Sequence, residues 1–540
     1  MLRVKLLGAL AVLTFSVVGL ATSADSQQNP NPNPNPNYQP TAVFCADSLS
    51  TTLCPVIPSN VGNDPPLKGF DYSGVFPQHP DVKSDVQSPF DNYSWQVFVA
   101  LNWPRGTPPG SPAQQALSGD LGPRVWETWN RVSQVFGPAP GLADCGPTPA
   151  GLERFDIGSD TYGRPVGENE EYIQAATGDP VIDVSGNWTI YERRVNNVEV
   201  GFLKAPYGPP GHKEWTLTTR QGQRNLVEQY KGNPTVYYPI SSDQTNGPNG
   251  AMELKAAWRI LDPAKHAENI QHYYVRRAFL TVAPDLVRDA NGQPGGKICA
   301  QVDLGLVAMH ILQKNARIGG LQPQWIWSTF EHVDDAPLAQ APCDPLNPDQ
   351  CQMDGSYDCP AALTQTDAHY SYFDPDCPQC STNQPPTKSA AKPIFAWNPT
   401  QPYALAYLRT SPDGRRVGSQ VSRCWSIYTL TASLNQQWQA ELGKVGSVFA
   451  NYMLVGSQWG FITVGRDPVQ GFLPKYLANT LVETYLQRAK DSGDSSCMAC
   501  HIQATLPNQT DVANVTSDFS FLPGLAPLLG HPLVRRDPLQ

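Results

Sequence analysis

Charged side chains are scarce in this chain of 540 residues. They make up 16% of it, against the roughly 25% that is usual for soluble domains. Lys and Arg number 38 against 48 Asp and Glu, which gives a formal net charge of −10. No basic field is available to neutralise phosphates, so nucleic acid is excluded as an expected partner.

Long apolar runs are missing beyond residue 20. A helix needs about 20 apolar residues to span a bilayer, and no later stretch reaches that length. No repeat of fixed period is visible, which argues against solenoids and propellers. Proline is abundant instead, with 53 residues, about twice the usual ~5%. These features predict a globular protein rich in loops.

The N-terminus has the pattern of an export signal. Arg3 and Lys5 precede an uncharged apolar run at 6–20, and small residues at 21–24 suit cleavage. The run of about 15 residues is too short to span a bilayer, so we expect removal of 1–24. A retained membrane anchor is the alternative. The mature chain is then expected in a bacterial periplasm or outside the cell, with no transmembrane span left.

Residues 25–44 are expected to form a disordered tether. Asn and Pro alternate from 29 to 37, and proline both blocks helices and removes the hydrogen-bond donors that a strand needs. Such a segment is stiff, extended and solvated. It serves either as a spacer or only as a disordered mature N-terminus.

The most informative motif is the C-x-x-C-H formed by Cys497, Cys500 and His501. In c-type haem attachment each thiol forms a thioether with one haem vinyl group, and the histidine ligates the iron. Composition alone predicts roughly 0.004 such matches by chance. The motif therefore favours one covalent haem c over the alternatives, a tight disulfide or half of a zinc site. Covalent haem is attached beyond an energy-transducing membrane, so the export signal supports this interpretation.

The other ten cysteines suit an oxidising compartment, where up to five disulfides can form. Five of them crowd into 343–380, which predicts a disulfide-stapled surface insertion. Cys377 and Cys380 form a second C-x-x-C, but Ser381 stands where a haem motif has histidine. A four-cysteine zinc site is the alternative there. The ten are Cys45, Cys54, Cys145, Cys299, Cys343, Cys351, Cys359, Cys377, Cys380 and Cys424.

The region 45–428 has the pattern of a β-rich domain. Segments rich in aromatic or β-branched residues are bounded by Pro, Gly or Asp, which predicts strands. Their density and the long connections favour a large antiparallel sandwich or barrel. The expected strands lie at 95–101, 252–261, 272–283, 298–313 and 323–332, with a β-meander over 181–204.

The region 429–540 is expected to be helical and to hold the haem, which makes the chain mainly β, and α+β overall. Apolar residues recur at helical spacing on both sides of a short extended stretch. A helix feeding into the motif from upstream can pack its apolar stripe on the haem. The expected elements are a helix capped by Thr431 or Ser433, an extended segment at 452–455 and a second helix starting at Pro474.

The sequence near the motif shows no clear candidate for the sixth ligand of the iron. After His501 the sequence has no methionine, and His531 is the only conventional nitrogen ligand. The distal ligand is therefore expected from the β-rich region, unless the iron is five-coordinate. His310 is the first candidate, because it lies in an apolar run where an unpaired imidazole would be costly. Met309 and Met453 follow.

Two further groups of polar residues stand out in a chain so poor in charge. Glu331, His332 and Asp335 end an aromatic strand, and Glu253 and Lys255 share one face of another. They could line a cleft beside the haem as proton donors. Ordinary salt bridges and turn acids are the alternative, and no catalytic residue is assigned.

Taken together, these segments resemble a family of bacterial exported single-haem cytochrome c-like proteins. The resemblance covers most of the mature chain, and its segments other than the haem motif are modestly specific. It implies haem attachment at Cys497, Cys500 and His501, while the insertion at 343–380 and the Asn-Pro tract are departures. The matching segments are 95–104, 252–261, 305–314, 325–335, 477–501 and 518–522.

Three kinds of function are expected from these observations. The first is electron transfer by a six-coordinate haem that exchanges electrons with a redox partner protein. The second is a haem-dependent oxidoreductase whose five-coordinate haem acts on a small-molecule substrate, with peroxidase-like or nitrogen-oxide chemistry. The third is a secreted β-rich binding module with a structural or sensory haem.

Overall fold

The structure of the chain is a computed structural model, which describes about three fifths of the sequence. The predicted signal segment 1–24 lies outside the described residues, as do most of the tether 25–44 and most of the insertion 343–380. Among the described residues, no helix has the length and apolar character needed to cross a membrane. The described residues are 40–46, 52–59, 61, 87–107, 111–118, 121–137, 143–159, 165–167, 170–171, 180–207, 211, 213, 215–229, 236–243, 247–262, 270–284, 287–288, 295–315, 324–343, 369–377, 380, 382–384, 395–397, 404–406, 409–410, 416–459, 476–487, 496–506 and 515–526.

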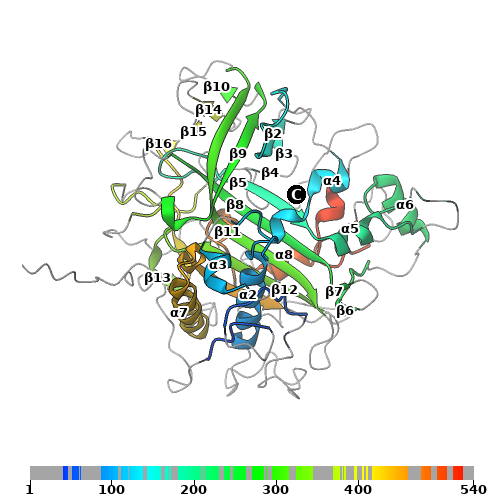
Figure 1. Cartoon of the computed structure of the whole chain (residues 1–540). Helices are drawn as coiled ribbons and strands as arrows, with labels where there is room; N and C mark the ends of the chain where they lie inside the picture. The colour runs from blue at the N-terminus through cyan, green and yellow to red at the C-terminus, as the bar shows by residue number, and fades with distance from the viewer. Residues whose placement is uncertain are drawn as a thin grey trace, which may run out of the picture.

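A curled ten-stranded mixed sheet forms the centre of the described fold, which confirms a mainly β chain with added helices (Figure 1). Most strand pairs are antiparallel, but β2 and β9 run parallel, whereas an antiparallel sandwich or barrel was predicted. The sheet contains β1 (Asn130–Arg131), β2 (Glu153–Ser159), β3 (Pro165–Gly167), β4 (Glu170–Glu171), β5 (Ile190–Val195), β8 (Met252–Leu261), β9 (Val275–Val282), β11 (Ile298–Asn315), β12 (Gln324–His332) and β19 (Tyr452–Trp459). Four of the predicted strands are confirmed as β8, β9, β11 and β12.

The longest strand, β11, is where the sheet forks. Its first half pairs with β9 over 298–305, and its second half pairs with β12 over 308–315. The strand β8 pairs with β11 over 303–313, along the opposite edge. Because β9 and β12 share one edge of β11 in succession, they diverge from each other. The register with β8 shifts between Leu306 and Ala308, and such a bulge bends a strand and increases its twist.

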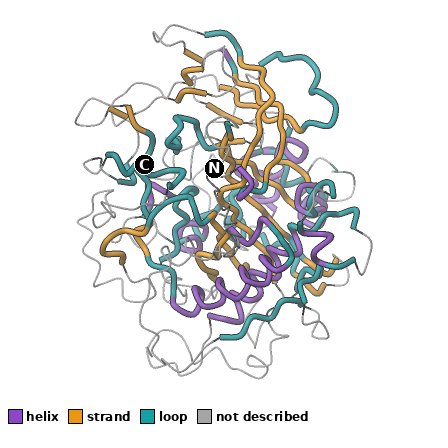
Figure 2. Tube along the Cα trace, turned by 60° about the vertical axis from the view of Figure 1, so that its left-hand side comes forward, coloured by secondary structure: helices purple, strands orange, loops and turns teal. Residues whose placement is uncertain are grey.

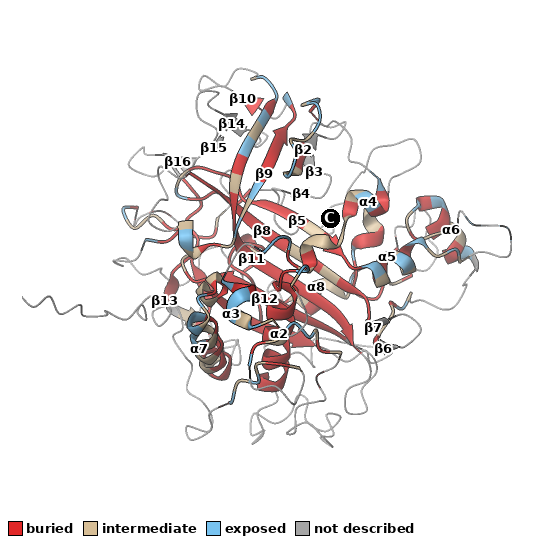
Figure 3. Cartoon of the chain, viewed as in Figure 1, coloured by how far each residue is buried: buried red, intermediate tan, exposed pale blue. Residues whose placement is uncertain are grey.

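Two helices, α2 (Gln87–Leu101) and α7 (Thr429–Lys444), cover one face of this sheet (Figures 1 and 3). The Trp95 ring stacks on Trp438 of α7 with centroids 5.6 Å apart, and it meets Phe330 of β12 edge-on at 5.0 Å. Ser328 of β12 donates to the Ser94 hydroxyl at 2.7 Å. We call this side the helix face. The helix α7 and the strand β19 confirm the helix expected near 431 and the extended segment at 452–455. The predicted cap is wrong, because α7 begins at Thr429 and both Thr431 and Ser433 lie within it.

The prediction of a strand at 95–101 is wrong, because these residues belong to α2. Every residue of α2 except Gln96 is buried, including polar ones such as Asp91 and Ser94. The helix therefore has no exposed polar stripe, and its short apolar run at 95–101 cannot be told from a buried strand by periodicity. The helix ends just before Pro104, where the residue before a proline disfavours the helical conformation.

Two other predicted elements differ in the structure. The meander at 181–204 contains β5, but its second half is the helix α5 (Asn197–Lys204). The Asn196 side chain accepts from Glu199 N at 3.0 Å, so Asn196 is a helix N-cap rather than part of a turn of the meander. The second predicted helix is also wrong within 476–487, which holds turns and a 3-10 helix at Thr484–Leu486. Its apolar residues are nevertheless buried.

Shorter elements surround the sheet, and in Figure 2 most helices lie in the lower half of the molecule, below projecting strands. The predicted helical haem region is not confirmed, because the described residues of 476–526 contain one five-residue helix and two 3-10 turns. The remaining elements are α3 (Ala113–Leu117), α4 (Val132–Phe136), α6 (Arg220–Gln229), α8 (Cys497–His501), β6 (Ser241–Asp243), β7 (Gly247–Asn249), β10 (Val287–Arg288), β13 (Leu338–Cys343), β14 (Phe395–Trp397), β15 (Ala404–Ala406), β16 (Arg409–Thr410), β17 (Arg416–Val417) and β18 (Arg423–Trp425), with 3-10 helices at Trp126–Thr128, Ile270–His272, Val448–Asn451 and Leu522–Leu525.

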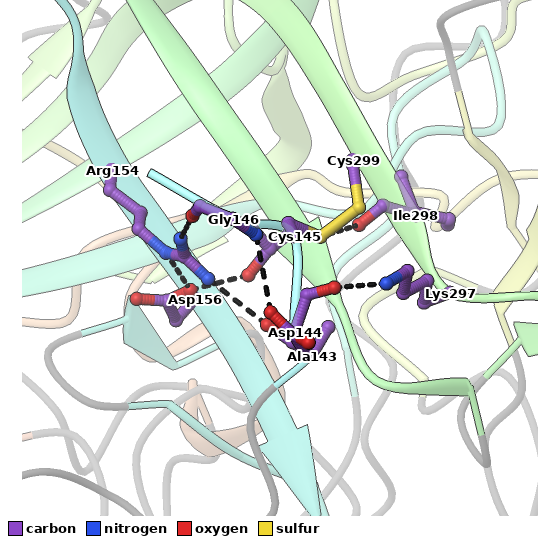
Figure 4. The surroundings of a disulfide bond; sticks show 10 residues. Ala143, Asp144, Cys145, Gly146, Arg154, Asp156, Lys297, Ile298 and Cys299 are labelled. Atoms are coloured by element: carbon purple, nitrogen blue, oxygen red, sulfur yellow. Dashed lines mark hydrogen bonds and ion pairs between the residues drawn. A yellow bond between two sulfur atoms is a disulfide. The ribbon is translucent and has the colours of Figure 1, made fainter. Parts of the chain in front are cut away.

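Disulfides form in the described part of the chain, as the cysteine count predicted. The bridge Cys145–Cys299 ties the loop before β2 to the start of β11 (Figure 4). Arg154 of β2 holds the same loop, donating to the carbonyls of Gly146 at 2.7 Å and Ala143 at 3.0 Å. The other bridges seen are Cys45–Cys54 and Cys377–Cys380. The second C-x-x-C is therefore a disulfide.

Candidate functional site

The C-x-x-C-H motif forms one short helix, α8. The Ser496 side chain caps it by accepting from Ala499 N at 3.3 Å. Positions i, i+3 and i+4 lie on one side of a helix, so Cys497, Cys500 and His501 are presented together. Both cysteines are present as thiols. Burial raises the pKa of the Cys497 thiol well above its usual range.

The motif lies against the face of the sheet opposite to α2 and α7. Residues paired across antiparallel strands share a face, and His310 pairs with Thr329 while Trp327 pairs with Gln458. We call this side the motif face. Gln458 Oε1 accepts from Met498 N at 3.2 Å, and Thr329 Oγ1 accepts from Asn479 at 2.8 Å.

The imidazole of His501 is held in one orientation. Its Nδ1 donates to the carbonyl oxygen of Phe519 at 2.7 Å, and a carbonyl can only accept. The hydrogen is therefore on Nδ1, which leaves the lone pair on Nε2. The ring meets Trp327 at 5.2 Å and Phe521 at 5.0 Å, both edge-on. Burial lowers the pKa of His501 to about 4, so the ring is neutral near pH 7.

The Phe519 carbonyl belongs to a strained turn. Asp518 and Phe519 have φ angles of 49° and 69°, in the left-handed region that costs an L-residue about 1–2 kcal/mol. The Asp518 carboxylate accepts from Lys314 Nζ at 2.8 Å and from Tyr238 N at 2.9 Å. The Lys314 and Asp518 side chains are 1% and 0% exposed. A buried ion pair on the central strand thus fixes the turn that faces His501.

His310, the first candidate for the distal ligand, lies on the motif face. Its Nε2 is buried, makes no hydrogen bond, and is 3.4 Å from Glu483 Oε2. His310, Glu483 and Lys255 all influence the pKa of His501 through their charges, so they lie near it. Lys255 pairs with His310 across β8 and β11, and its Nζ is 4.9 Å from the Tyr191 ring centroid. The structure therefore groups an imidazole, a carboxylate and an ammonium beside the motif.

The other ligand candidates are placed differently. Met309 points to the helix face, within the apolar core of α2 and α7. Met453 belongs to a small apolar cluster against which Cys497 packs. His531 lies outside the described residues. Met453 is thus the only one of these three that the structure places beside the motif.

Most of the polar residues singled out near the aromatic strand are engaged in the fold. Glu331 is buried in an ion pair with Arg423 and also accepts from Thr480 N at 2.5 Å. His332 stacks on Tyr273 with centroids 4.2 Å apart. On β8, the Glu253 carboxyl lies against that of Glu199, and burial raises the pKa of Glu253 to about 7. Glu331 therefore follows the salt-bridge alternative. Glu253 does not, because its neighbour is a second buried carboxyl.

The sequence did not predict that Lys314, Glu483 and Asp518 belong to the site. Glu483 carries the best signal, because it is a lone acid in an apolar segment of a chain poor in charge. Its carboxylate also accepts from Asn479 N at 3.0 Å. Lys314 and Asp518 have no such signal, since 204 positions separate them.

The residues present fit a covalent haem. Two thiols and an imidazole with an unprotonated Nε2 share one helix side, and a second buried imidazole nitrogen without a hydrogen bond lies near them. No group of three His, Cys, Asp or Glu suited to a bare metal ion occurs in the described part of the chain. The chain matches no family model, no curated protein and no solved structure. The resemblance to exported cytochrome c-like proteins therefore stays a prediction.

Proposed function

We propose that this chain is an exported, periplasmic c-type haem protein that transfers electrons. The observation that carries the proposal is the hydrogen bond from His501 Nδ1 to the Phe519 carbonyl at 2.7 Å. It leaves Nε2 with a free lone pair, able to ligate a metal, beside two thiols on the same helix. Ligating histidines characteristically donate their other ring nitrogen to a carbonyl or carboxylate in this way.

Each residue of the motif has a distinct part in this proposal. Cys497 and Cys500 would anchor the haem through thioethers, and His501 would ligate its iron. The haem would supply one-electron chemistry. The aromatic rings of Trp327 and Phe521 contact the imidazole edge-on and restrict the orientation of its plane. A redox partner protein is the expected counterpart.

His310 is the residue that decides between a shuttle and a catalyst. If its buried Nε2 becomes the sixth ligand, the iron is six-coordinate and suits electron transfer. This requires Nε2 to turn from Glu483, 3.4 Å away, toward the haem. The move would exchange this carboxylate contact, which is not a hydrogen bond, for a bond to the iron.

A second candidate function is a haem-dependent oxidoreductase, favoured by the group of His310, Glu483 and Lys255. Together they could donate or accept protons beside a five-coordinate iron. Substrates would then be small molecules, with peroxidase-like or nitrogen-oxide chemistry.

The experiment is expression of the full chain with a c-type haem maturation system. We expect one covalent haem by mass spectrometry of the denatured protein, and its loss from Cys497→Ser with Cys500→Ser. His501→Ala should change the haem spectrum, while the exposed His369→Ala serves as the control. A chain that carries no haem after maturation would refute the proposal.

Carbon monoxide then separates the two candidates. An electron-transfer protein ligated by His310 should be low-spin and indifferent to carbon monoxide, and His310→Ala should make it bind the gas. If the unaltered protein is high-spin and binds carbon monoxide when reduced, the oxidoreductase replaces the shuttle.

A further inference from the structure

The turn at 517–520 is fixed to the sheet rather than to the motif helix. Ser520 N donates to Ser517 O at 3.0 Å, which closes the turn. Asp518 reaches Lys314 on β11 with one carboxylate oxygen and Tyr238 N with the other. Since both oxygens are engaged, the carboxylate has little freedom to rotate. The backbone beside it is held with it.

The Lys314 side of the pair is equally constrained. Its Nζ lies 5.6 Å from the centroid of the Trp325 ring, and the side chain is 1% exposed. Lys314 N also donates to Ala251 O at 2.9 Å. The ammonium is therefore a fixed point on the central strand, to which the turn is attached.

From this fixed point, contacts lead to the motif by two routes. The Phe519 carbonyl accepts from His501 Nδ1, and the Phe519 ring meets Trp327 with centroids 6.0 Å apart. Trp327 in turn meets the imidazole. Two consecutive residues in left-handed conformations persist only where the surroundings determine them, and here the buried pair does so.

We infer that Lys314 and Asp518 are positioning residues for His501: their ion pair holds the left-handed turn that aims the Phe519 carbonyl at Nδ1. The pair thereby selects the tautomer with Nε2 unprotonated and fixes the ring plane. This inference rests on the proposed function for its meaning, because an imidazole poised in this way is useful to an iron. A hydrogen bond donated by Nδ1 makes a histidine ligand more basic, which favours ferric iron.

The test compares two double variants of the full chain. Lys314→Met with Asp518→Gly removes the anchor without leaving a buried charge, and glycine accepts the left-handed conformation. Lys314→Gln with Asp518→Asn keeps an amide pair that can hydrogen-bond across the same gap. Lys444→Gln, at an exposed ion pair, is the control. Circular dichroism and urea unfolding check that each variant folds.

The first readout uses the chain before haem attachment. Nitrogen chemical shifts of labelled histidines report the tautomer, with the His501 signal assigned by His501→Gln. We expect the Nδ1–H form in the unaltered chain and in the amide pair, and a mixture of both tautomers in the variant without the anchor. A folded variant without the anchor that keeps only the Nδ1–H form overturns the inference.

The second readout is the reduction potential of the haem-loaded protein. It should rise in the variant without the anchor, because the less basic imidazole stabilises ferric iron less, and stay near the original in the amide pair. An unchanged potential in all variants also overturns the inference while leaving the proposed function intact. Absence of haem, by contrast, refutes the proposed function. The tautomer measurement alone then decides whether the ion pair positions His501.

Discussion

Acid should weaken the fold through His332, which is buried between aromatic rings. Its Nδ1 accepts from Asp334 N at 3.1 Å, and its Nε2 is 3.0 Å from the carbonyl oxygen of His272. Both contacts are satisfied by the neutral ring with its hydrogen on Nε2. Protonation would place a second hydrogen against the Asp334 N–H. Burial is the main reason that the pKa of His332 falls to about 4.

The size of the effect follows from the two pKa values. The unfolded chain has a pKa near the ordinary ~6.5, so between that value and about 4 it binds the proton more readily than the folded chain. Stability is therefore fully present above pH 6.5 and is lost as the pH falls. The loss amounts to about 2 kcal/mol by pH 5 and about 3 kcal/mol by pH 4.

The assay is urea unfolding at a series of pH values from 4 to 7.5, for the original chain and for His332→Gln. The substitution lowers stability at neutral pH, but it should remove this part of the pH dependence. The difference between the two proteins should thus shrink toward acid by about 2–3 kcal/mol. His369→Gln, at an exposed histidine, should keep the original profile. Parallel profiles for the original chain and His332→Gln would refute the reasoning.

Three other predictions use the same unfolding measurement. Arg259→Met should cost about 3–5 kcal/mol, because the buried Asp183 carboxylate loses the cation that contacts it at 2.7 Å and keeps a hydrogen bond from Asn187 N, while Arg277→Met at an exposed pair should cost under about 1 kcal/mol. Removing the bridge Cys145–Cys299, which closes 154 positions, should cost about 5 kcal/mol, against about 2.5 for Cys45–Cys54, which closes 9. Glu253→Gln should flatten the loss of stability between pH 4.5 and 7, since a carboxyl with a raised pKa favours folding only while protonated. Equal costs for the two bridges, or a steeper profile for Glu253→Gln, would contradict these expectations.

The strands that sequence predicts well are those whose character is local. The residues of β8 are flanked by Gly and Asp and rich in apolar side chains, and the predicted bounds 252–261 match the structure. Helix α2 failed because it is buried on nearly every side, and α5 because Asn196 caps a helix where a turn was expected. In both cases tertiary burial or capping outweighed the local pattern.

The residues of the candidate site also differ in whether local sequence predicts them. The motif itself is local, so Cys497, Cys500 and His501 are visible in the sequence. His310 is a candidate because an unpaired imidazole in an apolar strand would be costly. The structure places it beside the motif. The ion pair of Lys314 and Asp518 joins distant parts of the chain, and its two members look like ordinary surface charges when read singly.

The arrangement of the motif face also determines an order of events during synthesis. Most of the strands that form it are made well before the segment that covers it, which reaches back 290 positions from Leu481 O to Tyr191 and 305 positions from Tyr485 to Pro180 O. Closing so large a loop is slow. Trp327, 2% exposed in the finished fold, meets His501 and Phe519 of the last stretch, so this side of its ring stays uncovered until that stretch docks. Under the proposed function that interval gives the attachment machinery access to the thiols, and docking afterwards seals the cofactor into the protein.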